Sequence, residues 1–326
     1  MFSLEREIVQ LRDNGVLDDD AAIRLIAIER REVVSLYGEL RFLAWGGVML
    51  IVAGVGVLVS KNLERIGPLS IAVAIAAAAI GCYAYSEWRR RASRREGFTH
   101  SLVDDYVLLL AALLVSADIG FIEHQWHLLG PNWQRHFLVL AVLHAVTAYI
   151  FDSRLVLSLS ISSLAAFLGI ERNFERVFDS TTDLAVRAFL CSSIVFAWRA
   201  LDIEVRKRAA GTPSRAPYAF SAVFAHFATN LAFWGALILA FDRSTRTWGC
   251  VLAVLFAIGS AWYGVREREE MFVVYAWIYG VIAVDVFVIG QIGPEEVFLA
   301  LYLIVSAIAA IVGLRMTHVR MREAAA

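Results

Sequence analysis

The sequence has few of the residues that build redox or metal sites, and few that break helices. Among its 326 residues are 3 cysteines and 5 prolines. Cys82, Cys191 and Cys250 each stand alone inside an apolar run, without a CxxC pair or other ligand spacing, so we interpret them as small packing side chains. The prolines fall in loops or at the ends of apolar runs. This placement predicts uninterrupted helices, which weighs against the broken helices of many secondary transporters.

Charge is also scarce, and neither sign is in excess. Charged residues make up 19% of the chain, and the formal net charge is −1. We expect no nucleic-acid partner, because binding DNA or RNA requires a surplus of positive charge on one face. The sequence contains no HExxH, GxSxG, P-loop or GxGxxG pattern. We therefore expect no enzymatic activity, no cofactor and no bound metal.

Long hydrophobic runs are what the sequence has in abundance. Apolar residues make up 59% of the chain, against about 45–50% in average soluble domains. A bilayer core about 30 Å thick is crossed by roughly 20 helical residues. We therefore predict an all-α fold, a polytopic transmembrane helix bundle embedded in membrane lipids, with about ten spans at residues 42–60, 67–86, 102–122, 136–151, 155–170, 182–201, 218–241, 247–265, 271–290 and 295–314.

The segments between the apolar runs bear on two features of this topology, the number of spans and their orientation in the membrane. The runs 136–151 and 155–170 are separated by only three residues, so they form either a tight helical hairpin or one kinked element, which would reduce the total to nine spans. With ten spans, 22 of the 30 Lys and Arg residues lie on the side of the N-terminus, with Arg199 at the inner end of the sixth span counted among them, and 7 lie on the other side, while Arg187 lies deeper inside that span. Cytoplasmic loops carry the positive excess, so both termini are predicted to be cytoplasmic, including a tail at 315–326.

Residues 1–41 are predicted to form a cytoplasmic amphipathic helical hairpin ahead of the bundle at 42–314. Ile8 and Leu11 recur at helical spacing, and Gly15 provides a left-handed stop. A second helix then begins near Asp18, with acidic residues in its first turn. Such a unit could dock a cytoplasmic protein partner or a second copy of the chain, which would give a homo-oligomer.

The first quarter of the chain carries a set of recognisable short patterns. These are Gly15-Val16-Leu17, the glycine-rich run GGVMLIVAGVGVLVS, and the stretch from Lys61 to Gly67. From Leu4 to Tyr85 the sequence resembles a bacterial family of predicted membrane proteins known as domain of unknown function 2157. In that family the last stretch tends to read Ala-x-Asn-Trp-x-x-Ile, so Asn62 and Ile66 match while Leu63 replaces Trp. The resemblance implies a multi-spanning inner-membrane protein with no established activity, and the carried-over positions are Gly15, Asn62 and Ile66.

Four ionisable residues inside the predicted spans are the main candidates for a polar site. An ionisable side chain within a bilayer costs a few kcal/mol, so each is a functional hypothesis. Asp118 lies late in the third span, Asp183 and Arg187 early in the sixth, and Asp285 late in the ninth, which places all four in the outer half of the membrane. If they converge, they form an outward-facing pocket for a small polar solute or ion. Alternatively, Asp183 and Arg187 pair locally at i, i+4 and the two aspartates lie at the wet interface.

His144, His226 and Asn230 are secondary candidates. Each histidine stands alone near the middle of a span, without the spacing of a metal-ligand pair, and Asn230 follows His226 by one helical turn. We interpret the histidines as hydrogen-bonded across helices. Two functional hypotheses result: a non-enzymatic interaction or sensory membrane protein, and alternatively a transporter of a small polar solute or ion.

Overall fold

The structure, a computed structural model, describes most of the chain and contains only helices within the described part. The described residues are 8–9, 11–13, 15, 17–29, 37–96, 102–128, 130, 135–170, 182–209, 220–292 and 296–325. The all-α prediction is confirmed for these residues. The short helix α2 precedes a bundle of ten helices: α2 Asp19–Glu29, α3 Tyr37–Ile66, α4 Pro68–Glu96, α5 Leu102–Trp126, α6 Arg135–Phe151, α7 Arg154–Phe167, α8 Thr182–Ala209, α9 Ser221–Phe241, α10 Arg246–Glu267, α11 Glu270–Ile292 and α12 Glu296–Ala325.

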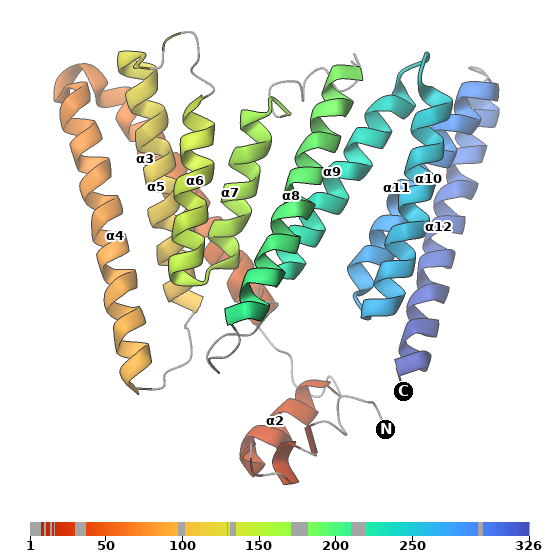
Figure 1. Cartoon of the computed structure of the whole chain (residues 1–326), viewed down its shortest axis with the longest axis horizontal. Coiled ribbons are helices and arrows are strands. Elements are labelled where there is room, and N and C mark those ends of the chain that lie inside the picture. Colours follow the sequence, from red (N-terminus) through yellow and green to blue (C-terminus); the bar gives the residue numbers. More distant parts are fainter. Residues whose placement is uncertain are drawn as a thin grey trace.

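Consecutive helices from α3 to α12 run in opposite directions, and α2 lies beyond one end of the bundle (Figure 1). The C-terminal end of α12 lies at the same end of the bundle as α2. Each of the ten predicted apolar runs overlaps one of these helices. Within the described part, six helices are long and apolar enough to cross a membrane, namely α4, α5, α8, α9, α10 and α11, and shorter apolar stretches occur in α3, α6, α7 and α12.

The alternative of one kinked element at 136–170 is wrong, because α6 and α7 form a tight hairpin. Asp152 adopts a left-handed conformation with φ 56° and reverses the chain. Ser153 then caps α7, its side chain accepting a hydrogen bond from the Val156 N–H at 3.4 Å. A Ser at this position satisfies one of the unpaired N–H groups of the first helical turn. The hairpin preserves the alternating direction of the helices.

Several helices extend beyond the predicted apolar runs at the end of the bundle nearest α2. The α4 helix continues through Glu87, which pairs with Arg91 one turn later at 2.7 Å. The α8 helix likewise continues through the i, i+4 pair of Glu204 and Arg208 at 2.9 Å. Such pairs stabilise helical turns in water, where the apolar pattern has already ended. The helices therefore continue beyond the apolar runs that were predicted as spans.

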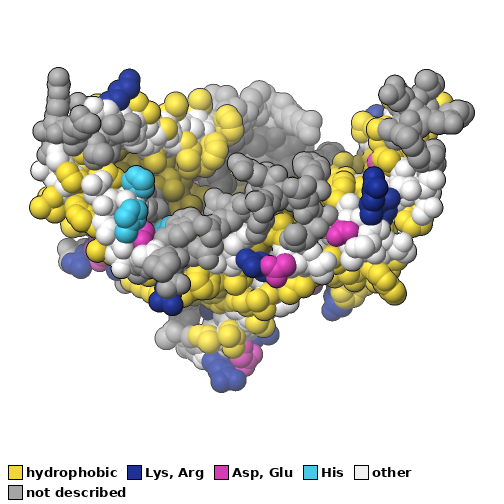
Figure 2. Space-filling model, turned by 90° about the horizontal axis from the view of Figure 1, so that it is seen from above, with side chains coloured by type: hydrophobic (Ala, Val, Ile, Leu, Met, Phe, Trp, Pro, Cys, Tyr) yellow, Lys and Arg dark blue, Asp and Glu magenta, His cyan; other side chains and the backbone are white. Residues whose placement is uncertain are grey.

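The bundle packs around several buried hydrophobic clusters and has an apolar outer surface. One cluster joins α5 to α9 around fully buried Leu157, Ile161 and Phe224. Another joins α9, α10 and α11 through small residues such as Ala236 and Ala253, which allow close approach of helix backbones. Viewed from above, the end of the bundle shows many hydrophobic side chains and charged ones in only a few places (Figure 2). Large hydrophobic side chains also lie exposed in the middle of the helices, such as Leu50 in α3, Ile80 in α4 and Ile311 in α12. A surface this apolar is typical of contact with lipid.

The N-terminal unit is described only in part. Gly15 has φ 70° and donates its N–H to the Arg12 carbonyl at 2.9 Å, as expected for the predicted left-handed turn. Ile8 and Ala22 are buried, whereas Ile23 on α2 is 63% exposed. Residues 1–7 and 30–36 lie outside the described residues, so the complete hairpin stays a prediction. Gly15 is thus the one family position with described surroundings, because the side chains of Asn62 and Ile66 in α3 are also outside the described part.

Candidate functional site

Asp183 and Arg187 form the local pair that their spacing predicted. The Arg187 Nη2 atom donates to Asp183 Oδ2 at 2.8 Å. The Nη1 atom donates to the Leu168 carbonyl at 3.4 Å, at the C-terminal end of α7. Gly169, with φ 79°, follows this carbonyl, and a Cβ atom there would lie 2.7 Å from Arg187 Nη1. Arg187 therefore covers the negative end of the α7 dipole in addition to pairing with Asp183.

Among the described residues, no hydrogen bond or ion pair joins Asp118 or Asp285 to this pair or to each other. Asp285 on α11 accepts hydrogen bonds from the Tyr302 hydroxyl at 2.9 Å and the Ser306 hydroxyl at 2.7 Å, both on α12. Asp118 lies on α5, and its buried Oδ1 atom has no hydrogen-bond partner among the described residues. The α5 and α11 helices stand on opposite sides of α8 (Figure 1). The structure therefore brings Asp183 and Arg187 together but leaves the other two candidates in separate places.

The secondary candidates make contacts across helices. His144 on α6 is fully buried, and its Nε2 atom lies 2.8 Å from the Ser116 hydroxyl on α5. His226 on α9 stacks on the ring of Phe272 on α11, with centroids 4.7 Å apart. Asn230 donates to the His226 carbonyl at 2.8 Å and accepts from the Tyr279 hydroxyl of α11 at 2.7 Å. Within the described part of the chain, no three His, Cys, Asp or Glu side chains group as metal ligands would.

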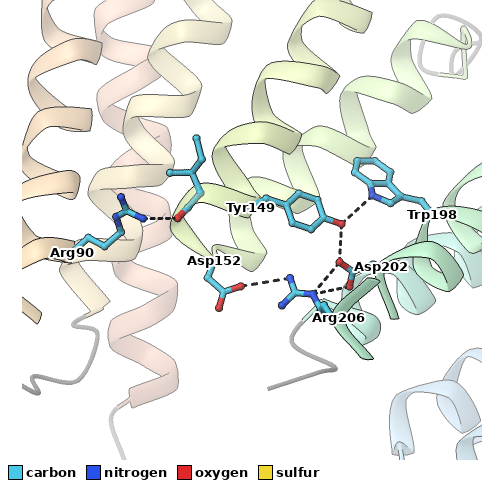
Figure 3. Close-up of polar contacts among 7 residues, drawn as sticks. Arg90, Tyr149, Asp152, Trp198, Asp202 and Arg206 are labelled. Atoms are coloured by element: carbon cyan, nitrogen blue, oxygen red, sulfur yellow. Dashed lines mark hydrogen bonds and ion pairs between the residues drawn. The ribbon is translucent and has the colours of Figure 1, made fainter. Parts of the chain in front are cut away.

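A polar cluster with a buried centre joins α6 and the turn after it to α8, at the end of the bundle nearest α2. We call it the α6–α8 cluster; it consists of Tyr149, Asp152, Trp198, Asp202 and Arg206 (Figure 3). The Arg206 Nε atom donates to both carboxylate oxygens of Asp202, at 3.0 and 3.1 Å. Asp202 also accepts from the Tyr149 hydroxyl at 2.9 Å, and that hydroxyl accepts from Trp198 Nε1 at 3.0 Å. Asp152 lies 3.7 Å from Arg206 Nη2 and adds a second negative charge.

The surroundings of Arg206 explain how the cluster retains charge although it is buried. The side chains of Arg206 and Asp202 are only 12% and 3% exposed. Burial of an ion pair is tolerated when hydrogen bonds satisfy the remaining polar atoms, as Tyr149 does for Asp202. The guanidinium also lies over the ring of Phe220, 4.6 Å from its centroid, which adds a cation–π interaction. The cluster thus fixes the α6–α7 turn against α8.

Sequence reasoning missed this cluster for a definable reason. The spacing of Asp202 and Arg206 was visible, but i, i+4 pairs occur on many exposed helix surfaces. Nothing in the sequence shows that Tyr149 and Asp152, about fifty residues earlier, lie against them. Nearby, Arg90 of α4 donates to the Ile150 carbonyl at 3.0 Å (Figure 3). The same end of the bundle therefore ties α4, α6 and α8 together.

Two of the hollows on the described part of the bundle combine a large volume with a mainly apolar lining. A cavity of about 370 Å³ lies among α8, α9, α10 and α11 and is lined by Arg199, Tyr263 and several aromatic side chains. A wider groove of about 610 Å³ follows α10, α11 and α12 and contains Asp285. Both have mainly apolar linings with a few polar groups, which is the usual character of ligand sites.

Comparison with known protein families gives a match to the N-terminal part of the chain. Residues 9–157 match the model of a family described as "Predicted membrane protein (DUF2157)". The match extends the resemblance noted at the N-terminus through α6, and it includes Asp118, His144, Tyr149 and Asp152. No curated protein and no solved structure matches the chain. The other side of the α6–α8 cluster, Asp202 and Arg206, lies beyond the matched segment.

Proposed function

We propose that the chain is a multi-pass protein of the bacterial inner membrane, since residues 9–157 match a family of predicted membrane proteins. In this proposal all ten helices of the bundle cross the membrane, and both termini are cytoplasmic. The alternating helix directions and the common end of α2 and the α12 C-terminus support this topology (Figure 1). The excess of Lys and Arg predicted for that end supports a cytoplasmic location.

The two shortest helices are compatible with this topology. At a rise of about 1.5 Å per residue, α6 and α7 are about 25 and 21 Å long, less than a bilayer core of about 30 Å. Both helices contribute to the same buried hydrophobic cluster, in which Ala148 of α6 and Leu157 and Ile161 of α7 are fully buried. Neighbouring protein surrounds their buried faces, so a short span does not expose backbone to lipid there.

Within this topology the protein serves as a non-enzymatic interaction or sensory membrane protein. The observation that carries this proposal is the position of α2, outside the bundle, with Ile23 exposed to solvent. The polar residues of the bundle support it, since Arg187 donates its hydrogen bonds to Asp183 and to the Leu168 carbonyl at the end of α7. It does not pair with Asp118 or Asp285. The N-terminal unit then docks a cytoplasmic protein or a second copy of the chain.

Photocrosslinking in intact cells tests this function. A photoreactive amino acid replacing Ile23 is expected to form adducts with a cytoplasmic protein or with the chain itself. The same group at Leu128, which is exposed at the opposite end of the bundle, serves as the control and should not form these adducts. A chain lacking residues 1–36 should still insert but lose the association. The proposal is wrong if Ile23 gives no adduct, or if the shortened chain associates as before.

Transport of a small polar solute or ion is the second candidate, and it rests on Asp285. This carboxyl group lies in the α10–α12 groove between two hydroxyl donors, an arrangement that could exchange a proton or bind a small cation within the membrane. If it does, proteoliposomes containing the protein should dissipate a pH or potassium gradient, and Asp285→Asn should abolish this flux. Asp183→Asn is the control, because that carboxylate is largely exposed. Absence of flux through the unmodified protein would eliminate transport of these ions.

A further inference from the structure

The cavity among α8 to α11 opens sideways, towards the surface that faces lipid. Helices α8 and α10 both pack against α9, and the cavity lies between them. Ala225 and Thr229 of α9 contribute to its lining. Leu255 and Trp262 of α10 also line it and are 56% and 61% exposed on the outside of the bundle. A lipid chain can therefore reach this cavity from the bilayer.

Arg199 is the one charged side chain among the described residues that line this cavity, and the other lining residues are apolar or aromatic apart from Thr229 and Ser260. The Arg199 Nε atom donates to the Ser221 hydroxyl at 3.0 Å, and Nη2 donates to the Tyr263 hydroxyl at 2.9 Å. These partners fix the guanidinium at the cavity, but both are neutral. In the part of the chain that the structure describes, no carboxylate lies within ion-pair distance of Arg199. Other arginines of the same helix differ, since Arg206 pairs with Asp202 and Arg208 with Glu204.

Arg199 therefore has no counter-charge among the described residues, and an anion from outside the chain would supply one. A guanidinium stays protonated, so neutralisation by loss of a proton is not available to it. It carries five N–H donors in a plane, a geometry suited to phosphate and carboxylate oxygens. Arg199 also lies towards the C-terminal end of α8, the end that carries the α6–α8 cluster and the basic residues Arg206, Lys207 and Arg208. Charged side chains at a helix end indicate that this end lies at the level of the lipid headgroups.

We propose that this cavity is a binding site for an anionic phospholipid, whose phosphate pairs with Arg199 and whose acyl chain lies against Leu255 and Phe256. A volume of about 370 Å³ is within the range of about 300–1,000 Å³ found for small-molecule sites. Basic pockets between transmembrane helices are suited to lipid headgroups. A zwitterionic phospholipid carries its own ammonium counter-charge, so the unpaired guanidinium favours a lipid with net negative charge. Inorganic phosphate would leave the apolar part of the cavity empty.

Trp262 provides a reporter at the mouth of the cavity. The full chain is reconstituted in phosphatidylcholine vesicles that contain either brominated phosphatidylglycerol or brominated phosphatidylcholine at equal mole fraction. The fluorescence lost in Trp262→Phe isolates the emission of Trp262. Brominated phosphatidylglycerol is expected to quench this emission with a relative affinity roughly fivefold or more above phosphatidylcholine, consistent with a charge-assisted hydrogen bond.

Variants of two arginines on the same helix separate this site from general attraction to basic residues. Arg199→Gln should bring the relative affinity close to one, Arg199→Lys should retain part of the preference, and Arg208→Gln should leave it unchanged. Equal quenching by both lipids in the unmodified protein overturns the proposal, as does a preference that survives in folded Arg199→Gln. If Arg199→Gln does not fold, high salt must lower the preference of the unmodified protein, and a salt-independent preference overturns the site. Selective quenching by a brominated fatty acid but not by phosphatidylglycerol overturns the assignment to a phospholipid.

Discussion

Replacing Asp202 by alanine is expected to lower the free energy of unfolding by about 3 kcal/mol, in the range measured when one partner of a buried ion pair is removed. The reason is the 12% exposure of the Arg206 side chain, which would keep its charge without its closest carboxylate. Asp152, at 3.7 Å, compensates only in part. The Tyr149 hydroxyl would also lose its acceptor. Thermal unfolding in detergent, followed by circular dichroism, measures the change.

Glu204→Ala is the matched control for Asp202→Ala. Glu204 pairs with Arg208 at the same i, i+4 spacing on the same helix, but these side chains are 54% and 78% exposed. Exposed pairs contribute about 0–1 kcal/mol, so this variant should unfold close to the unmodified protein. Equal effects of the two substitutions would show that the α6–α8 cluster adds nothing beyond an ordinary surface pair, and its role in fixing the α6–α7 turn would be rejected.

Gly249→Ala is expected to destabilise the bundle by about 3 kcal/mol or more, at the upper end of the cost of overpacking. Gly249 is buried in the first turn of α10, directly after the short connection from α9. A Cβ atom there would lie closer than 3.0 Å to the backbone of Leu239 and Ala240 in α9. Backbone atoms cannot rotate away as a flexible side chain can. The substitution must therefore separate α9 from α10.

The turn between these helices leaves little room for such a movement. The backbone N–H and the hydroxyl of Ser244 both donate to Asp242 at 2.8 Å, which holds the connection tight and lowers the pKa of the Asp242 carboxyl group. Gly259→Ala on the same helix is the control, because its new Cβ atom meets nothing within 4 Å. That variant should be neutral or slightly stabilising. If Gly249→Ala melts at the same temperature as Gly259→Ala, close approach of α9 and α10 at Gly249 is not required.

Part of the candidate site could be read from the sequence and part could not. The contact of Arg187 with Asp183 follows from a helical spacing of four, since residues one turn apart share a face. The separation of Asp118 from Asp285 does not follow from helical spacing. Both lie at a similar predicted depth, but depth along a helix gives no information on lateral position, and their helices stand on opposite sides of α8. A single polar pocket was therefore a reasonable expectation that the arrangement of helices does not support.

Sequence by itself determined the helical class, the positions of the ten apolar helices and the turn at Gly15, because each depends on neighbouring residues: hydrophobic length, charge at the helix ends and a left-handed glycine. Only the tertiary structure decided that Asp202 and Arg206 are buried against Tyr149, and that Arg199 has neutral partners beside an apolar cavity. Those contacts join residues far apart in the chain. They depend on which helix faces which, and nearly uniform apolar helices do not encode this locally, because many lateral arrangements hide their backbone equally well.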